Sequence, residues 1–475
     1  MTQSPDLSII NSLTSVTNAF QTTGSFLKWL EKKRLSPDYA VEEKPISQLQ
    51  NWQISDRSGL LRIEHDSGKF YTVEGISVNT NFGPISTWDQ PIIIQPEFGI
   101  LGIVSKVFRG VRHFLMQAKM EPGCVNGYQI SPTVQATRSN YTRVHGGKLP
   151  PYVELFLADS KGIRTEFRYL QSEQTTRFLG KRNLNILIDI KEDVPILNNF
   201  KWLTLSEIKS FYHIANLVNM NTRSILACID PLPIASSECI RQVTKSELPK
   251  KSVSKFQASL YLSKISKQKS LHDIESILSW LSNLKTKYFI EVRKIPLDKV
   301  SNWQLAEDKM LHAEGQYFSI VGAEVSADRE VNSWDQPLVA QPTKDVAGLL
   351  AKKINGIYHF LFQAKIDPGN LDKIQLAPTV SCSVPEYREK KNVAPTFLQF
   401  FSSGSEHEFL LDVVLSEEGG RFYHAENIYR ILILDDFNEK EIPENFIWIA
   451  YPQLHELLIH GYFNIESRTL ISYLI

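Results

Sequence analysis

The sequence predicts an α+β protein that consists of two similar sheet-and-helix domains. The main observation is an internal duplication: residues 88–91, WDQP, return as residues 334–337, and residues 113–119, HFLMQAK, return as residues 359–365, HFLFQAK. Within each copy, short alternating runs typical of strands are mixed with amphipathic stretches typical of helices. The spacing between the copies is far longer than the ~20–50 residues of a solenoid repeat, so a whole domain is duplicated.

The length of 475 residues agrees with two domains, since single domains usually span about 100–200 residues. We expect the first domain at residues 1–230 and the second at residues 271–475. Between them, residues 231–270 are rich in serine and lysine and begin with Pro-x-Pro. This composition is typical of a solvated linker with some helix, and a specific binding role for its lysines is the alternative.

Each copy opens with an amphipathic stretch that contains a tryptophan, and this predicts helices at residues 25–35 and 271–284. Apolar and polar residues then alternate ahead of a glycine, which predicts strands at residues 70–73 and 317–320.

A β-hairpin is the next predicted element of each copy. Residues 99–108 and 111–119 flank Arg109-Gly110, and the second copy has matching runs around Asn355-Gly356. Asn-Gly between two alternating runs is among the strongest hairpin signals in a sequence.

The rest of each copy is predicted to contain further strands and a closing helix. The expected strands are residues 152–157, 186–189, 396–401 and 431–434, and the expected helices are residues 205–218 and 451–462.

The charge balance excludes one class of partner. Lysine plus arginine and aspartate plus glutamate both number 52, so the net charge is zero. A general nucleic-acid binder carries a basic surplus, so no nucleic-acid partner is expected.

The four cysteines form no CxxC pair and differ between the copies, which indicates reduced thiols rather than disulfides or zinc. No run of 18 apolar residues occurs, and residues 1–11 lack the features of a signal peptide. The sequence therefore predicts a soluble cytoplasmic protein with no membrane partner.

Standard catalytic motifs are missing. No GxGxxG follows a strand, and the sequence has no P-loop, no HExxH and no GxSxG. Neither a metal site nor a dinucleotide cofactor is expected, so any chemistry must rest on less familiar polar clusters.

Three polar clusters are candidates for a site. Residues 117–123 (QAKMEPG) end a strand ahead of a Pro-Gly turn, a position that often lines a pocket. Residues 135–143 (QATRSNYTR) combine two arginines with hydroxyls near glycines, which suits a diphosphate, because arginine binds phosphate oxygens bidentately. Residues 172–183 form the third cluster, which returns in part at residues 416–427.

Structural alternatives exist for most of these residues. His113 and His359 lie on apolar strands, where a packed histidine is the alternative to a catalytic base. Trp88 and Trp334 could stack on a nucleotide base or fill a core. Glu173 could form an ordinary surface ion pair with the arginine four residues later.

The two copies differ at residues that could bind phosphate. Arg138 faces Val384, and Lys181-Arg182 face Ala425-Glu426. A phosphate site built from the first copy's basic residues is therefore not present unchanged in the second. We expect the first pocket to be the working one and the second to be altered.

The motifs resemble the NDP-hexose 2,3-dehydratases of deoxysugar biosynthesis. The resemblance is carried by residues 117–123, 131–141, 171–174 and 219–223, and by residues 416–424 of the second copy. It covers nearly the whole chain apart from the N-terminal tail and the linker, and it includes the duplication. It implies tandem Nudix-like domains and a homodimer, although the Nudix magnesium-binding signature is absent.

The resemblance also implies a reaction. The substrate is a nucleotide-linked 4-keto-6-deoxyhexose, typically with dTDP, whose ketone acidifies the C3 hydrogen. A base removes that proton, the C2 hydroxyl leaves as water, and tautomerisation gives a 3,4-diketo-2,6-dideoxyhexose. No redox cofactor is needed. The unstable product implies a downstream reductase that acts on the C3 ketone.

Roles follow as hypotheses. Glu173 or His113 is the candidate base, Tyr141 or a water is the candidate acid, and Lys119 is the candidate for stabilising the enolate oxygen. The candidate substrate-binding residues are Trp88, Gln95, Gln117, Arg138, Asn140, Arg143, Arg177, Lys181, Arg182 and Asn183. The expected second pocket contains Trp334, Lys365, Tyr387, Glu417, Arg421, Tyr423 and Asn427.

Two rival functions belong to other classes. A Nudix-type nucleotide-sugar pyrophosphohydrolase would depend on magnesium and release a nucleoside monophosphate. A non-catalytic nucleotide-sugar binding protein would retain its ligand unchanged.

Overall fold

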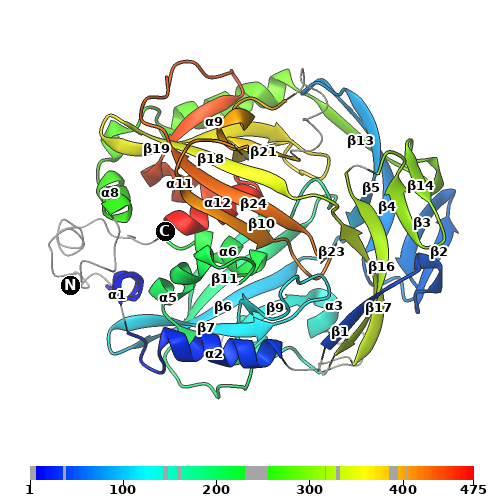
Figure 1. Cartoon of the computed structure of the whole chain (residues 1–475), viewed down its shortest axis with the longest axis horizontal. Helices are drawn as coiled ribbons and strands as arrows, with labels where there is room; N and C mark the ends of the chain where they lie inside the picture. Colours follow the sequence, from blue (N-terminus) through cyan, green and yellow to red (C-terminus); the bar gives the residue numbers. More distant parts are fainter. Residues whose placement is uncertain are drawn as a thin grey trace.

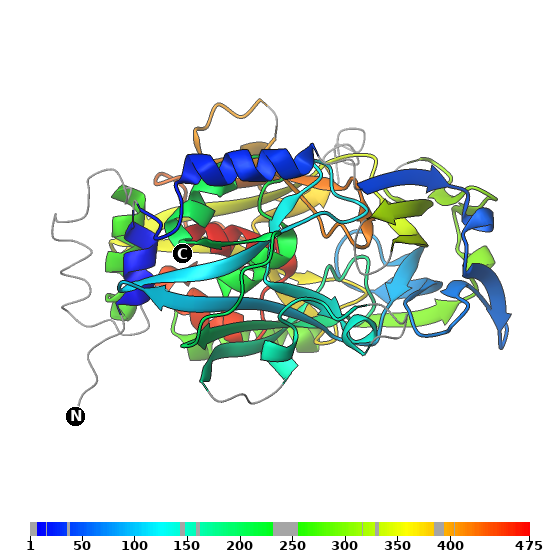
Figure 2. The same cartoon turned by 90° about the horizontal axis from the view of Figure 1, so that it is seen from below.

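The chain folds into an α+β structure in which four β-sheets are described (Figure 1). The computed structural model describes residues 7–15, 17–35, 39–142, 148–157, 162–230, 255–315, 317–327, 332–383, 394–402 and 404–475. Two large sheets and most of the helices form one end of the molecule, and two smaller sheets form the other (Figures 1 and 2). The prediction of an α+β class is confirmed.

The strands fall into two series that follow the two copies. Those of the first copy are β1 (Tyr39–Lys44), β2 (Trp52–Arg57), β3 (Leu60–His65), β4 (Thr72–Thr80), β5 (Thr87–Ile94), β6 (Gly99–Phe108), β7 (Val111–Lys119), β8 (Gln129–Ser131), β9 (Val134–Thr137), β10 (Ile163–Ser172), β11 (Arg182–Ile190) and β12 (Phe200–Leu203). Those of the second copy are β13 (Ile290–Ile295), β14 (Trp303–Leu305), β15 (Lys309–His312), β16 (Ser319–Ala327), β17 (Ser333–Ala340), β18 (Asp345–Ile354), β19 (Ile357–Ile366), β20 (Ile374–Pro378), β21 (Val380–Ser383), β22 (Phe409–Ser416), β23 (Phe422–Tyr423), β24 (Glu426–Ile433) and β25 (Phe446–Ala450).

Helices precede, interrupt and close each series. They are α1 (Ser8–Thr14), α2 (Thr23–Arg34), α3 (Arg138–Tyr141), α4 (Glu154–Leu157), α5 (Leu205–Ser210), α6 (Met220–Ala227), α8 (Lys255–Lys264), α9 (Ile274–Lys287), α11 (Tyr451–Ile459) and α12 (Ile465–Leu474). None of the helices in the described ranges combines the length and the apolar composition that a membrane span requires.

The two large sheets have the same topology. The first has the order β10-β11-β6-β7-β12, and the second has the order β20-β19-β18-β24-β22, with β25 also on β19. In both, a long central hairpin pairs in parallel with the strand that follows the polar cluster: β6 with β11, and β18 with β24. This agreement confirms the predicted internal repetition at the level of strand order.

The predicted hairpins are confirmed with nearly the expected bounds. Arg109 and Gly110 have φ angles of 51° and 78°, and Asn355 and Gly356 have 54° and 82°. Two consecutive left-handed residues match the right-handed twist of the flanking strands, which is why Asn-Gly is favoured in such a turn.

The strands predicted at residues 152–157 and 396–401 are wrong. These segments form the short helix α4 and a 3-10 turn at Leu398–Phe400. A Cβ built on Gly102 would lie 2.4 Å from the Phe156 ring, and one on Gly348 would lie 2.4 Å from the Phe401 ring. Phe156 and Phe401 therefore cover glycines on the outer faces of the large sheets. The apolar segments that contain these two residues pack on the sheets and are not strands of them.

The closing helices are shorter than predicted, and two later helices were not predicted. The segment at 205–218 is helical only in α5 and in a 3-10 turn at Phe211–His213, and α11 ends at Ile459. Helices α6 and α12 follow and lie between the two large sheets (Figure 1). Their apolar residues, such as Ile225 and Leu470, belong to one core shared with both large sheets.

Part of the predicted linker is an ordered helix. Helix α8 lies within residues 231–270 and packs on β19, as α1 packs on β7. Residues 231–254 lie outside the described residues.

The two copies exchange a strand. β1 of the first copy pairs with β16 of the second, and β13 of the second copy pairs with β4 of the first. Each small sheet is thus completed by a strand from the other copy, and both sheets share a single core that includes Trp52, Ile63, Met310 and Phe318.

The repeated WDQP motif holds the exchanged segments. The indole of Trp52 donates to the Asp335 carbonyl at 2.7 Å, and the indole of Trp303 donates to the Asp89 carbonyl at 3.1 Å. The Asp335 carboxylate also accepts from Lys44 Nζ at 2.9 Å. The motif recurs in both copies because each uses it to bind the other.

Glycine is required where an exchanged strand approaches closely. A Cβ built on Gly322 would lie 2.3 Å from the carbonyl oxygen of Lys44, its partner on β1. We expect Gly322→Ala to lower the free energy of unfolding by about 3 kcal/mol, because the added methyl group pushes β1 away from the sheet. Urea unfolding of the purified full chain would measure this loss.

Gly24→Ala is the matched control, because Gly24 is exposed on α2 and no atom lies within 4 Å of the position that an added Cβ would take. Alanine favours a helix over glycine, so this variant should be as stable as the parent or slightly more so. Equal stability of the two variants would contradict the close approach at Gly322.

Candidate functional site

The turn that follows β7 contacts the second copy directly. The Gly123 amide donates to the Gly419 carbonyl at 2.7 Å, and the His424 amide donates to the Gly123 carbonyl at 3.0 Å. A Cβ built on Gly123 would lie 1.4 Å from the carbonyl oxygen of Phe422. Only glycine fits here, which explains why both copies of this chain have Pro-Gly at this turn.

The same contact is made in the opposite direction. The Gly369 amide donates to the Thr175 carbonyl at 2.8 Å, and the Gly180 amide donates to the Gly369 carbonyl at 2.9 Å. The loop after β10 therefore lies against the turn after β19 of the other copy. In the same way, the loop after β22 lies against the turn after β7.

Two buried arginines cross between the copies. Arg223 on α6 donates to the Ser416 carbonyl at 2.7 Å, and Arg468 on α12 donates to the Ser172 carbonyl at 2.5 Å. The two arginines have exposed fractions of 0% and 1%. They fix the carbonyls that come directly before Glu417 and Glu173.

The crossing loops assemble polar side chains from both copies, which we call the first site. Its members are Lys119, Glu121, Gln135, Glu173 and Lys181 from the first copy, and Glu418 and Arg421 from the second.

An amide bridges two carboxyl groups of the first site. Gln135 Nε2 donates to Glu121 Oε1 at 2.6 Å and contacts Glu418 Oε1 at 3.4 Å. Gln135 is itself held by Asn219, whose Nδ2 donates to Gln135 Oε1 at 3.2 Å. Asn219 also caps α6 by accepting from the Thr222 amide, so the helix fixes the bridge.

Lys119 lies at the end of β7, where the strand meets this bridge. Its Nζ donates to the Gln135 carbonyl at 3.3 Å and lies 3.6 Å from Glu121 Oε1. Only 10% of the side chain is exposed. A partly desolvated cation beside carboxylates can stabilise negative charge that develops on a substrate.

Glu173 is buried and interacts electrostatically with Glu121. Asn183 Nδ2 donates to its Oε1 at 2.5 Å, while Oε2 has no hydrogen-bond partner in the described part of the chain. Burial raises the pKa of Glu173, and the positive charges of Arg468 and Lys181 oppose this shift.

Lys181 and Arg421 supply further positive charge. Lys181 Nζ donates to the Glu97 carbonyl, and burial lowers the pKa of Lys181 to about 8, partly offset by Glu173. The Arg421 guanidinium stacks on the Tyr71 ring at 4.1 Å. Stacking on an aromatic ring leaves the edge of a guanidinium open to an anion.

Glu418 differs from the other two carboxyl groups because its side chain is only partly buried. Burial of its carboxyl group raises the pKa of Glu418 to about 8, and the charge of Glu121 adds to the shift. Near pH 7 this group therefore carries a proton and can donate it.

The second site has the same plan with different residues. Lys365 lies 3.7 Å from Asp367 Oδ1 and 3.5 Å from Ser381 Oγ. Thr175 Oγ1 donates to Asp367 Oδ2 at 3.0 Å. Where the first site has Glu418, this one has Gln174.

Several residues of the two sites are the same. Glu417 accepts from Asn427 at 2.5 Å, as Glu173 does from Asn183, and burial raises the pKa of Glu417 to about 7. Arg177 stacks on the Phe318 ring at 4.1 Å, as Arg421 stacks on Tyr71.

Because the loops cross between the copies, two arginines lie at the opposite site from the one that the sequence analysis assigned to them. Arg421, expected in the second pocket, acts electrostatically on Lys181 and Glu418 of the first site. Arg177, expected in the first pocket, lies on an aromatic ring of the second copy. The assignment assumed that each copy builds its own pocket.

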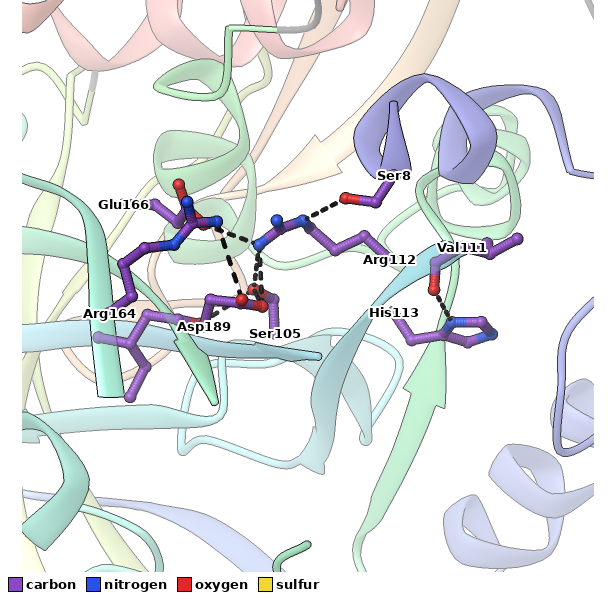
Figure 3. A network of polar contacts seen from close by, with 9 residues as sticks. Ser8, Ser105, Val111, Arg112, His113, Arg164, Glu166 and Asp189 are labelled. Atoms are coloured by element: carbon purple, nitrogen blue, oxygen red, sulfur yellow. Dashed lines mark hydrogen bonds and ion pairs between the residues drawn. The ribbon is translucent and has the colours of Figure 1, made fainter. Parts of the chain in front are cut away.

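His113 lies apart from the first site, near the opposite end of β7 from Lys119. Its Nδ1 donates to the Val111 carbonyl at 2.9 Å (Figure 3), and its Nε2 accepts from the Ala19 amide at 3.2 Å. Burial lowers the pKa of His113. With both ring nitrogens bonded to backbone, the histidine ties the N-terminal segment to the hairpin.

The neighbouring Arg112 points to the other face of β7 (Figure 3). It contacts Glu166 and Asp189 at 2.9 Å each, Ser105 at 3.1 Å and Ser8 of α1 at 3.1 Å. This buried network holds α1 against the first large sheet.

The cluster at residues 135–143 is only partly described. Tyr141 closes α3, and burial raises its pKa, with Arg138 opposing. Of the other members, Arg138 and Asn140 are both exposed. Arg143 and, in the second copy, Tyr387 lie outside the described residues.

The remaining assigned residues make local contacts in strands and turns of their own copies. Trp88 and Trp334 donate to Gln90 and Gln336 at 2.9 Å within their own WDQP motifs. The others are Gln95, buried and 3.4 Å from Glu97; Gln117, paired with Ser131 and Phe200; Arg182, at the start of β11; and Tyr423, stacked on His424.

Sequence analysis missed Glu121 and Glu418 as site residues. One signal was available, since Glu418 faces Gln174 in the comparison of the two copies. The crossing that brings Glu418 to the first copy could not be seen without the fold.

In the described ranges, no group of three or more histidine, cysteine, aspartate or glutamate side chains is arranged to hold a metal ion. Cys124 is buried and free beside Glu121, and burial raises the pKa of its thiol. Cys239 lies outside the described residues.

Comparison with known families shows to which family the chain belongs. The model of the NDP-hexose 2,3-dehydratase family matches residues 23–229 and again residues 274–474. The chain belongs to this family. The two matched regions correspond to the two series of strands, so the family pattern contains the duplication.

Curated relatives are similar over nearly their whole length, and each is named dTDP-4-dehydro-6-deoxy-alpha-D-glucopyranose 2,3-dehydratase. The protein from Saccharopolyspora spinosa is 38% identical over 467 residues, which is 98% of this chain and 93% of that protein. The Streptomyces violaceoruber protein is 37% identical, covering 95% and 96%, and the Amycolatopsis orientalis protein is 36% identical, covering 94% and 88%.

The crossing arginines give a stability prediction. We expect Arg468→Met to lower the free energy of unfolding by about 3 kcal/mol, because the Ser172 carbonyl loses a charged donor inside the core. Denaturant unfolding of the full chain would measure the loss. Arg293→Met is the control, because Arg293 is largely exposed on β13. A loss no larger than that of the control would show that the crossing contact contributes little.

Proposed function

We propose that this dehydratase removes the C2 hydroxyl of a nucleotide-linked 4-keto-6-deoxyhexose, with dTDP as the nucleotide. The product is a 3,4-diketo-2,6-dideoxyhexose. The observation that carries the proposal is the first site, where Lys119 interacts with Glu121 of its own copy and with Glu418 of the other. The names of the relatives support the choice of substrate.

Proton transfer from C3 needs a base, and Glu173 is the better placed of the two candidates. Its Oε2 has no partner among the described residues, and its pKa is raised by burial. A carboxylate of raised pKa accepts a proton from carbon more readily than one of ordinary pKa. His113 remains a prediction, but both of its nitrogens are bonded to backbone.

Negative charge then develops on the substrate oxygen at C4. Lys119 is proposed to stabilise it, because its ammonium is desolvated and fixed at the end of β7. The C2 hydroxyl departs, and the enol tautomerises to the diketone. Tyr141 remains the sequence-based candidate for the acid.

The diphosphate requires cations, and we assign Lys181 and Arg421 to it. Arg421 acts electrostatically on both Lys181 and Glu418, and Glu418 acts on Lys181, which places their charges at one site. Arg138, Arg143 and Arg182 remain candidates from the sequence, and Trp88 remains the candidate for stacking on the nucleotide base.

Further properties belong to the same proposal. The two copies are taken as Nudix-like domains at residues 1–230 and 271–475, joined by residues 231–270. The enzyme is taken to be a cytoplasmic homodimer whose product passes to a reductase acting on the C3 ketone. Conversion without a redox cofactor follows from the reaction, because no carbon undergoes net oxidation by an external acceptor.

An assay with a trapped product tests the function. We expect the full chain, given dTDP-4-keto-6-deoxyglucose in EDTA with a 3-ketoreductase and NADPH, to yield a 2-deoxy sugar detected by mass spectrometry. Release of dTMP only after magnesium is restored would favour a pyrophosphohydrolase. Binding without any conversion would favour a binding protein.

Replacing the lysine separates its chemical role from binding. We expect Lys119→Met to lower kcat by about 100-fold with KM changed far less, because Lys119 interacts with charge that forms only in the transition state. Steady-state kinetics in the trapping assay would measure both constants. Equal effects on kcat and KM would count against this role. Lys69→Met, at an exposed site, is the control.

A further inference from the structure

We infer that Glu418, supplied by the second copy, is the general acid that protonates the departing C2 hydroxyl at the first site. The inference rests on the proposed dehydration and names a catalytic residue for it.

Glu418 lies in one cluster with Glu121 and Lys119, and it interacts electrostatically with the proposed base Glu173. Gln135 Nε2 holds Glu121 at 2.6 Å and Glu418 at 3.4 Å, and Lys119 lies 3.6 Å from Glu121. Glu121 and Glu173 are buried, with exposed fractions of 6% and 4%, whereas Glu418 is partly exposed. Glu418 is therefore the least buried of the three acidic residues.

One glycine makes room for this carboxyl group, and the glycine before it makes room for Cys124. A Cβ built on Gly420 would lie 2.5 Å from Glu418 Oε1, and one on Gly419 would lie 2.9 Å from Cys124 Sγ. In the first copy the corresponding residues are Thr175 and Thr176, which follow Gln174. The acidic residue and the glycine that accommodates it, Gly420, thus occur together in one copy.

The charges around Glu418 favour the form that donates a proton. Burial is the largest cause of its raised pKa, the carboxylates of Glu121 and Glu173 add to the shift, and Arg421 and Lys119 oppose it. Tyr141, the acid suggested by the sequence, holds its proton more tightly still, because burial raises a pKa that is already about 10.

The step balances with two carboxyl groups. Glu173 takes the C3 proton as the C3–H bond breaks, and the electron pair moves toward the C4 oxygen. When that pair returns, the C4=O bond re-forms, a C2=C3 double bond forms, and the C2–O bond breaks while Glu418 gives its proton to the leaving oxygen, which departs as water. Transfer of the enol proton to C2 completes the diketone, and exchange with solvent returns one proton to Glu418 and removes one from Glu173, so no oxidant or reductant is consumed.

The second site lacks this acid. Gln174 replaces Glu418, and Ala425 replaces Lys181. An amide cannot donate a proton and return as a stable anion. Elimination is therefore expected at the first site only.

The test separates the two bond cleavages. Exchange of the C3 hydrogen with D₂O reports proton removal, and the trapped 2-deoxy sugar reports C2–O cleavage. In Glu418→Gln we expect C3 exchange to continue while 2-deoxy sugar formation falls by about 100-fold or more. Glu64→Gln alters a buried carboxylate on β3, in one of the two small sheets. This variant is the control and should leave both rates unchanged.

The pH dependence of the unmodified enzyme gives a readout that needs no variant. Because Glu418 must be protonated to act, C2–O cleavage should fall as the pH rises through about 8. At saturating substrate, where loss of the Lys181 charge near the same pH does not limit binding, C3 exchange should not fall over that range, since a base works better ionised. Glu418→Asp should retain part of the elimination and its alkaline decline.

Other outcomes would overturn the inference. Equal loss of exchange and elimination in Glu418→Gln would indicate a structural role, and full elimination in that variant would exclude Glu418 as the acid. If the unmodified enzyme gives neither exchange nor product, the proposed function fails and the inference fails with it. Normal conversion by the unmodified enzyme with an unaffected variant overturns the inference alone.

Discussion

The contact between Gly123 and the loop at Gly419 is the constraint on which the first site depends. Two backbone hydrogen bonds hold the turn after β7 against a loop of the second copy, at a separation that excludes any side chain on Gly123. Lys119 and Glu121 come just before this turn, and Glu418 and Arg421 flank Gly419 and Gly420. The site is therefore a property of the joined copies, and neither copy contains it alone.

Residues that the copies share and residues in which they differ divide by role. The shared buried arginines, Arg223 and Arg468, each bind a backbone carbonyl of the other copy and hold the copies together. A buried polar group without a partner would be costly, so both copies keep an arginine together with the carbonyl that it binds. The residues that differ, among them Glu418 against Gln174, set what each site can do. A shared frame thus allows one site to change without loss of the fold.

Local signals in the sequence are sufficient to predict some elements and not others. The hairpin turns at Arg109-Gly110 and Asn355-Gly356 are predictable because left-handed backbone has a residue preference that is read locally. The segments at Phe156 and Phe401 resemble strands, because an apolar run does not reveal that its ring will cover a glycine of another strand. Lys119, Glu173 and Lys181 stand out as polar residues near strand ends. Glu418 does not, because its place depends on a crossing between residues far apart in the chain.

The exchange of β1 and β13 has a consequence for synthesis of the protein. β4 has β13 along one edge, and β13 ends at Ile295. During translation the edge of β4 therefore stays unpaired until more than half of the chain has left the ribosome. Open edges invite pairing with other chains, so rapid elongation through the intervening segment, or a chaperone that covers β4, would determine how much of the newly made protein reaches its native state.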